Sequence, residues 1–328
     1  MNGSQPPIIE VSHLVKRFGR VTAVAGIDFQ VAPGELFGFL GPNGAGKTTT
    51  INLLTGLARP DEGSIRVAGI DCTQNPKGAQ HLMGIVPDES NLYPELSGFD
   101  NLCFCGALYG MSKKDRESRA QALLAQFGLT DAGARKFAGY SKGMKRRLTI
   151  AAGIIHQPHI LFLDEPTTGI DVASARQIRQ LIARLNDEGT TIFLTTHYIE
   201  EAERLCRRIA FIVDGKIVRT DRLENLMQPL QGRHSIEFVL EQRHAALESR
   251  LQQAFPSLSV EQIDDSRIRV FARQKIPVGP LVRFFEECGV EVSEARKLRP
   301  TLEEVFVEVT GIEAAAIARD KERKGGAA

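Results

Sequence analysis

Short apolar runs alternate with amphipathic stretches over the first two thirds of the chain. The runs at 160–163 (ILFL) and 190–196 (TTIFLTT) are largely apolar, as in strands buried on both faces of a parallel sheet. Apolar positions recur at helical spacing within 95–127, which predicts a mostly helical region with an exposed charged face. Further elements are expected as strands at 8–15, 21–31, 35–40 and 64–69, as helices at 47–57 and after Ser141, and as an Asp-Gly hairpin at 209–220.

The pattern changes after about residue 230. Strands are expected at 235–240, 258–263, 267–271 and 290–298, with helices at 244–254, 278–288 and finally 301–311. The order β-α-β-β-α-β is the ferredoxin-like plan. We therefore expect a first domain at 7–228, an accessory domain at 233–311 and a frayed tail at 312–328, with Pro229 in the linker.

Composition limits the classes of protein to which the chain can belong. Its 328 residues suit two domains, and a net charge of +1 gives no general attraction to nucleic acid. No stretch approaches the ~18 apolar residues of a spanning helix, and the N-terminal residues do not resemble a signal peptide. The five cysteines are scattered, which indicates reduced thiols, and Cys103 and Cys105 lack partners for a zinc site.

The segment 41–48 (GPNGAGKT) fits the phosphate-loop pattern G-x-x-x-x-G-K-[ST]. Glycine has no Cβ, so Gly44 and Gly46 let backbone N–H groups wrap the phosphates. We expect Lys47 to reach the β- and γ-phosphates and the Thr48 hydroxyl to hold Mg²⁺. The helix that follows adds its positive N-terminal dipole. The predicted nucleotide-binding residues of this loop are Gly41, Pro42, Asn43, Gly44, Ala45, Gly46, Lys47, Thr48 and Thr49.

Two carboxylates end the apolar strand at 160–165 (ILFLDE). In a parallel sheet this end lies beside the phosphate loop, so Asp164 is expected to hold Mg²⁺ through water. Glu165 is then placed to orient or deprotonate an attacking water. An Asp-Glu pair after a strand is by itself more often a turn or a helix cap. Its position downstream of the phosphate loop, with PTTGID following, favours the functional interpretation.

Four segments in this order resemble the nucleotide-binding subunit of ATP-binding cassette (ABC) transporters: GPNGAGKTTT, YSKGMKRRL, ILFLDEPTTGID and TTIFLTTH. The resemblance covers about residues 7–225. It implies an α/β fold, a P-loop NTPase of ABC type with a mixed sheet core, an antiparallel β subdomain and a helical subdomain. The small ferredoxin-like α+β domain would follow it. The resemblance further implies ATP and Mg²⁺ as cofactors, and ATP hydrolysis coupled to transport.

The segment YSKGM at 140–144 is similar to the family signature LSGGQ. Ser141 and Gly143 are kept, whereas Tyr140, Lys142 and Met144 depart from it. In the family, this segment caps the γ-phosphate of ATP held by the other subunit, so the resemblance implies trans contacts by Ser141, Lys142 and Gly143. A serine N-cap and a helix dipole suit an anion. The alternative is a basic helix start on a solvated face.

Three more single residues are assigned by the same resemblance. His197 follows the strand 190–196 and corresponds to the histidine that contacts the γ-phosphate, although a histidine at a strand end is usually structural. Asp171 corresponds to the loop that communicates between the two sites, and it would also serve as a helix N-cap. Phe18 corresponds to the aromatic residue that stacks on adenine, with a place in the core as the alternative.

Asp88 occupies the position at which the family usually carries a glutamine that touches Mg²⁺. A shorter carboxylate can reach the metal through water, and Glu89 is the rival residue. The departure therefore leaves the ligand at this position open between the two carboxylates. Leu92, Tyr93 and Leu96 beyond it would form a groove for a membrane subunit or belong to the core.

Asp88, the SKGM segment and the C-terminal module together resemble the drug-resistance branch of exporter ATPases, whose separate membrane subunits form the channel. The branch implies a homodimer, or a heterodimer with a similar subunit, on integral membrane permeases at the cytoplasmic face, with no nucleic acid. The C-terminal module shows no catalytic constellation and is interpreted as regulatory or dimer-stabilising. One alternative is an ABC ATPase acting on ribosomes or DNA, but there is one phosphate loop and no heptad run. Another is a nucleotide-dependent regulator, which Glu165 disfavours.

Overall fold

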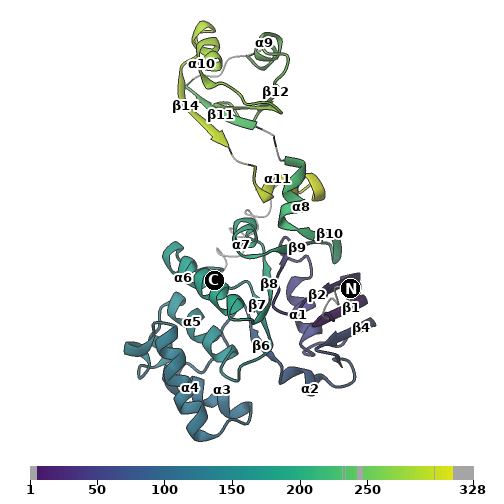
Figure 1. Cartoon of the computed structure of the whole chain (residues 1–328), viewed down its shortest axis with the longest axis vertical. Helices are drawn as coiled ribbons and strands as arrows, with labels where there is room; N and C mark the ends of the chain where they lie inside the picture. The colour runs from purple at the N-terminus through teal and green to yellow at the C-terminus, as the bar shows by residue number, and fades with distance from the viewer. Residues whose placement is uncertain (1–5, 231, 233, 242–246, 299, 313–328) are drawn as a thin grey trace, which may run out of the picture. The chain divides into compact units, whose positions relative to one another are not determined.

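The computed structural model describes residues 6–230, 232, 234–241, 247–298 and 300–312 (Figure 1). Contacts divide the chain into two compact units. The first runs through Leu223 and resumes at Val309, and the second is Glu224–Glu308. The start of the expected helix at 244–254, residue 231 of the linker and the expected tail beyond 312 lie outside the described residues. The domain limits 7–228 and 233–311 stay predictions, a few residues from this division.

A six-stranded sheet forms the centre of the first unit, in the order β10-β9-β3-β8-β7-β6. Strands β9, β3, β8, β7 and β6 pair in parallel, and β10 pairs antiparallel with β9, which makes the sheet mixed as expected. Its strands are β3 (Leu36–Leu40), β6 (Met83–Val86), β7 (Ile160–Asp164), β8 (Thr191–Thr196), β9 (Arg208–Val213) and β10 (Lys216–Arg222).

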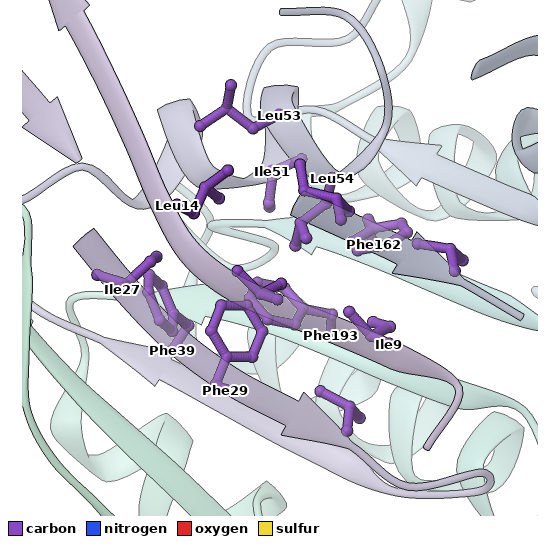
Figure 2. Packing of buried hydrophobic residues seen from close by; sticks show 14 of the residues in the cluster. Ile9, Leu14, Ile27, Phe29, Phe39, Ile51, Leu53, Leu54, Phe162 and Phe193 are labelled. Carbon is purple, nitrogen blue, oxygen red and sulfur yellow. The ribbon is translucent and has the colours of Figure 1, made fainter. Parts of the chain in front are cut away.

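A four-stranded antiparallel sheet packs against this centre, in the order β2-β1-β4-β5. Its strands are β1 (Ile9–Phe18), β2 (Val21–Val31), β4 (Glu62–Val67) and β5 (Ile70–Asp71). Phe29 of β2 stacks on Phe37 of β3 with ring centroids 5.8 Å apart. Figure 2 shows Phe29, Phe193 and Phe162 in the shared core, with Leu54 from the first helix. This core fixes the loop between β3 and that helix against both sheets.

The helices of the first unit are α1 (Lys47–Leu54), α2 (Pro76–Gln80), α3 (Gly98–Leu108), α4 (Lys113–Gln126), α5 (Lys142–Gly153), α6 (Val172–Asp187) and α7 (Ile199–Leu205). Short 3₁₀ turns occupy Thr130–Ala132 and Phe137–Gly139. Helices α3, α4 and α5 contact one another and form the helical subdomain (Figure 1). The expected helical region 95–127 is two helices, because Gly110 has φ +77 and Ser112 caps the start of α4.

The second unit has the expected ferredoxin-like plan. Its sheet order is β12-β13-β11-β14 with every pair antiparallel. Its elements are α8 (Leu223–Met227), the 3₁₀ turn Gln228–Leu230, β11 (His234–Leu240), α9 (Leu247–Ala254), β12 (Ser259–Gln262), β13 (Arg267–Ala272), α10 (Val278–Glu287), β14 (Val292–Leu298) and α11 (Leu302–Thr310), where α8 and α11 each cross a unit boundary. Phe238 and Phe285 are fully buried, with ring centroids 5.0 Å apart, and anchor its core. Within the described ranges, no helix is long and apolar enough to cross a bilayer.

Candidate nucleotide site

The loop at 41–48 lies between the end of β3 and the start of α1. Gly44 and Gly46 have φ of +82° and +103°, a region that side chains rarely adopt. A Cβ at Gly41 would stand 2.1 Å from the carbonyl oxygen of Ile212, and one at Gly46 would stand 2.3 Å from that of Ala23. The loop can therefore take this path against its neighbours only with glycine at these positions.

Lys47 is almost fully buried at the start of α1. Its Nζ donates to the carbonyl oxygens of Gly41 and Pro42, at 2.8 and 3.1 Å, which holds the side chain across the loop. Its Nζ also lies 3.0 Å from Oε1 of Glu165. The first N–H groups of a helix have no partner within the helix. This cation and these donors form a donor set that fits a phosphate group.

Glu165 follows β7 and is 7% exposed. Its Oε1 pairs with Lys47, and its Oε2 lies 2.5 Å from Nδ1 of His197 and accepts from the Thr168 hydroxyl at 3.0 Å. Its backbone has φ +49, which is uncommon for a residue with a side chain. The structure thus brings together three residues that the sequence separates widely: Lys47, Glu165 and His197.

The charge state of Glu165 follows from these contacts. Burial raises its pKa, but the hydrogen bond with His197 and the charge of Lys47 together lower it by more than burial raises it. The pKa of Glu165 therefore lies below its usual value. The carboxylate is therefore ionised at neutral pH. An ionised, positioned carboxylate is the form that can accept a proton from water.

His197 uses only one ring nitrogen in these contacts. Its Nε2 is buried and has no hydrogen-bond partner among the described residues. Because Nδ1 faces Glu165, Nε2 is the ring nitrogen left to contact a bound group. Buried polar atoms of this kind are normally paired, so the atom fits a contact with a bound anion.

Two of the predicted magnesium ligands, Asp164 and Thr48, differ in their exposure to solvent. Asp164 is buried at the end of β7, and its Oδ1 accepts from the Thr195 hydroxyl at 2.5 Å. Thr48 is exposed in the first turn of α1. The described residues hold no cluster of three His, Cys, Asp or Glu side chains suited to a metal. Hydroxyl and carboxylate oxygens suit Mg²⁺, which usually takes its other ligands from water and substrate phosphates, so the pair fits that ion.

Asp88 is half-exposed. Its Oδ1 is 3.4 Å from Nη2 of Arg146, a residue of α5. Burial raises the pKa of Asp88, and the opposing charge of Arg146 lowers it, while Glu165 and Asp164 add to the rise. Glu89 is exposed. Neither carboxylate contacts the side chain of Lys47 or of Glu165 within the described residues.

The segment 140–144 begins α5. Ser141 is its N-cap, since its Oγ accepts from the N–H of Met144 at 3.3 Å. Asp171 is likewise the N-cap of α6, accepting from the N–H of Ser174 at 2.9 Å. A Cβ at Gly143 would stand 2.5 Å from the Ser174 hydroxyl, so the starts of the two helices pack closely. Lys142, the first residue of α5, is exposed.

Phe18 ends β1 with its ring 55% exposed, so it is not a core residue. Nζ of Lys16 lies 5.4 Å from the ring centroid. Beyond Asp88, Leu92 is buried, Leu96 is half-buried and Tyr93 is 52% exposed. Of these three residues, Tyr93 alone is exposed.

Arg146 is the residue that the sequence analysis missed. No role was assigned to it from the sequence, but its guanidinium is buried and bonds to three backbone or side-chain oxygens. Its spacing of four from the exposed Lys142 places it one helical turn further along the same side of α5, which gives no signal of burial. The sequence alone does not show which side of that helix is buried.

Comparisons with known proteins agree with this geometry. Residues 24–168 match the family described as "ABC transporter". The chain is 40% identical to the linearmycin resistance ATP-binding protein LnrL of Bacillus subtilis (strain 168) over 71% of this chain and 75% of that protein. It is 37% identical to the daunorubicin/doxorubicin resistance ATP-binding protein DrrA of Streptomyces peucetius, over 95% and 94%.

A solved structure adds a further comparison. It is described as the dimeric structure of a post-hydrolysis state of the ATP-binding cassette MJ0796 bound to ADP and Pi. The TM-score is 0.61 and the identity 26%, over 66% of this chain and 98% of that one.

Proposed function

The chain belongs to the ABC transporter family and is the ATP-hydrolysing motor subunit of an exporter, and on this premise we propose that Glu165 activates the attacking water. The observation that carries the proposal is the buried carboxylate held by Lys47 and His197, at 3.0 and 2.5 Å. The relatives are named for resistance, which does not support an ATPase that acts on ribosomes or DNA.

The reaction divides among these side chains. The loop at 41–48 and Lys47 bind the phosphates and neutralise part of their charge. Glu165 accepts the proton of the attacking water, and His197 fixes that carboxylate through Nδ1. When bound, Mg²⁺ supplies charge neutralisation at the phosphates, and Thr48 and Asp164 would hold it. Phe18 offers an exposed ring on which adenine can stack.

The working unit in this proposal is a dimer. Ser141, Lys142 and Gly143 begin a helix whose N-terminus suits an anion, and Asp171 caps the neighbouring helix. These residues lie at two adjacent helix starts, which supports a contact with nucleotide on a second subunit. The neighbour MJ0796 is described as dimeric, which supports a pair of cassettes. The second subunit would be a copy of this chain or a similar one.

Transport would require integral membrane permease subunits, with this chain on the inner face of the membrane. The exposed ring of Tyr93 packs edge-on with Phe104 at 5.0 Å between centroids, which supports a docking surface beyond Asp88. The names of LnrL and DrrA support a toxic compound as cargo. The accessory domain at 233–311 would regulate the motor or stabilise the dimer.

A single substitution tests the role of Glu165. Glu165→Gln keeps the shape but removes the base, so kcat should fall by about 100-fold or more while ATP still binds. Steady-state ATP hydrolysis and binding of a fluorescent ATP analogue measure the two effects. The matched control is Glu188→Gln at the exposed C-cap of α6, which should leave both unchanged. Wild-type turnover in Glu165→Gln would refute the proposed role.

A further inference from the structure

Arg146 lies in the second turn of α5 with only 6% of its side chain exposed. Buried charges are tolerated where they are paired and hydrogen-bonded. Its neighbour Arg147 is also in α5 but bonds to the carbonyl oxygen of Phe127, within the helical subdomain. The two arginines therefore have different partners although they are adjacent in sequence.

The guanidinium of Arg146 bonds to two segments that are distant in sequence. Nη1 donates to the carbonyl oxygen of Pro87 at 2.5 Å, and Nη2 lies 3.4 Å from Oδ1 of Asp88. The same Nη2 donates to the carbonyl oxygen of Glu165 at 2.8 Å. One nitrogen is thus shared by the Asp88 carboxylate and the Glu165 backbone.

The Glu165 backbone depends on partners from outside its own turn. Its φ of +49 is unfavourable for a residue with a Cβ and persists where surrounding groups hold it. Its N–H donates to the carbonyl oxygen of Thr195 at 3.1 Å, and its carbonyl oxygen accepts from the N–H of Thr168 at 3.2 Å. Arg146 supplies the second bond to that carbonyl oxygen, and this bond comes from another helix.

A cavity lies beside the hydrogen bonds of Arg146 to Pro87 and Glu165. A cavity of about 370 Å³ is bounded by the segment from Asp88 to Ser90, by one side of α5 and by residues 168–170. Arg146 lines the cavity and bonds to both Pro87 and Glu165. Asp88 itself is half-exposed, and the chain leads from it to Tyr93 at the surface. The segment 88–90 therefore borders this cavity, and a displacement of the segment will change the guanidinium geometry.

We propose that Arg146 is a positioning residue that links the segment 87–93 to the backbone of Glu165. A shift of the Asp88 segment moves the shared Nη2 and so changes the hold on the Glu165 carbonyl oxygen. In the reverse direction, a nucleotide that repositions Glu165 displaces the surface at Tyr93. The inference rests on the proposed role of Glu165 and assigns a residue through which that site and this surface are connected.

A rigid planar fork is required for this link. Arginine can serve Pro87, Asp88 and Glu165 from fixed nitrogens, whereas lysine is a point charge on a flexible stem. Arg146→Lys keeps the charge but cannot make all three bonds at once. Charge alone therefore does not account for the proposed role, and the lysine variant separates charge from geometry.

The chain contains no tryptophan, so one introduced indole is a clean reporter. We place it by Tyr93→Trp in the Glu165→Gln background, which allows ATP binding without turnover, and add ATP with Mg²⁺. The emission of the reporter should change on binding. With Arg146→Met or Arg146→Lys, the amplitude should fall about fivefold or more, while the Kd for ATP stays within about twofold, because hydrogen bonds are sensitive to distance and angle. Arg147→Met is the matched control and should keep the full amplitude.

Two outcomes overturn the proposal: full amplitude in both Arg146 variants, or no emission change when Arg146 is native. If Arg146→Met does not fold, by circular dichroism, the lysine variant decides. A second measurement uses the chain with native Glu165, in which Arg146→Lys should lower kcat about tenfold with KM within about twofold. Unchanged kcat would also overturn it. Wild-type turnover in Glu165→Gln refutes the proposed function instead, so the two failures are distinguishable.

Discussion

Nζ of Lys47 and Oε1 of Glu165 lie 3.0 Å apart, and both side chains are more than nine-tenths buried. This pair joins the phosphate loop to the carboxylate that follows β7. Because the same ammonium group also donates to the carbonyl oxygens of Gly41 and Pro42, the loop and the proposed base share one cation. A charge in this position acts on both binding and chemistry.

Loss of that cation should abolish tight nucleotide binding. Lys47→Met removes the charge-assisted bonds to phosphate, so the Kd for ATP should rise by about 100-fold or more. Equilibrium binding of a fluorescent ATP analogue measures it. The matched control is Lys113→Met, which removes an exposed ammonium on α4 and should leave the Kd unchanged. An unchanged Kd in Lys47→Met would contradict the phosphate-binding role of the loop.

Phe18 should contribute to recognition of the base and not of the phosphates. Phe18→Ala removes the exposed ring, and base stacking on an aromatic side chain is worth about 1–3 kcal/mol, so the Kd for ATP should rise about 5- to 160-fold. Calorimetry with ATP and with inorganic tripolyphosphate separates the two parts. Phe18→Tyr should bind ATP normally. Equal losses for both ligands would show that the ring supports the loop and does not stack on adenine.

His156 should make the folded state sensitive to acid. Burial lowers its pKa to about 4, helped by His81 and opposed by the hydrogen bond from Nε2 to the carbonyl oxygen of Met83. Its Nδ1 is buried without a partner among the described residues, and its ring stacks on Tyr109 at 3.5 Å, so an added proton has no acceptor.

Because the pKa of His156 is lower in the folded state, the unfolded chain binds a proton more readily as the pH falls. The free energy of unfolding therefore has its full value above pH 6.5 and decreases as the pH falls from 6.5 towards 4. The loss should amount to about 1–2 kcal/mol after allowance for solvent screening of a partly exposed ring. Urea unfolding at pH 7.5 and pH 5 measures it. His156→Gln should weaken the dependence, and His159→Gln, at an exposed position, should retain it. An identical pH dependence in His156→Gln would rule this residue out.

A core substitution in the second unit should destabilise that unit and leave the nucleotide site intact. Phe238→Ala removes a fully buried ring that packs on Phe285, which should cost about 3–5 kcal/mol. Limited proteolysis should then cleave within 224–308 first, while ATP binding persists. Phe104→Ala, at a partly exposed ring of the first unit, should not increase cleavage there. Simultaneous loss of ATP binding would show that the two units do not fold independently.

Local chemistry explains why much of the fold was predictable. In the loop at 41–48, a Cβ at Gly41 or Gly46 would clash with the carbonyl oxygen of Ile212 or Ala23, so glycine is needed there. The strand before the loop and the helix after it have clear apolar patterns. Both N-caps, Ser141 and Asp171, satisfy N–H groups only three residues away, so the sequence contains the whole interaction. The ferredoxin-like order followed from apolar alternation in the same way.

The contacts within the site were less predictable because they join distant segments. Nothing near Arg146 in sequence indicates that Asp88 and Glu165 will face it, since all three meet only after β6, β7 and α5 pack. The strand β6 was also not assigned from the pattern. Strand β6 has only four residues and includes Gly84, too short for a period to show.

The contact of Gly143 with Ser174 has a genetic consequence. The starts of α5 and α6 are packed too closely for a Cβ at residue 143, so they form one surface that a dimer would present to its partner's nucleotide. In that dimer each reaction centre draws on two polypeptides. In a mixed dimer of native and Glu165→Gln chains, one of the two centres would still combine a native Glu165 with the intact helix starts of the other chain, so co-expression of that allele would lower transport without abolishing it.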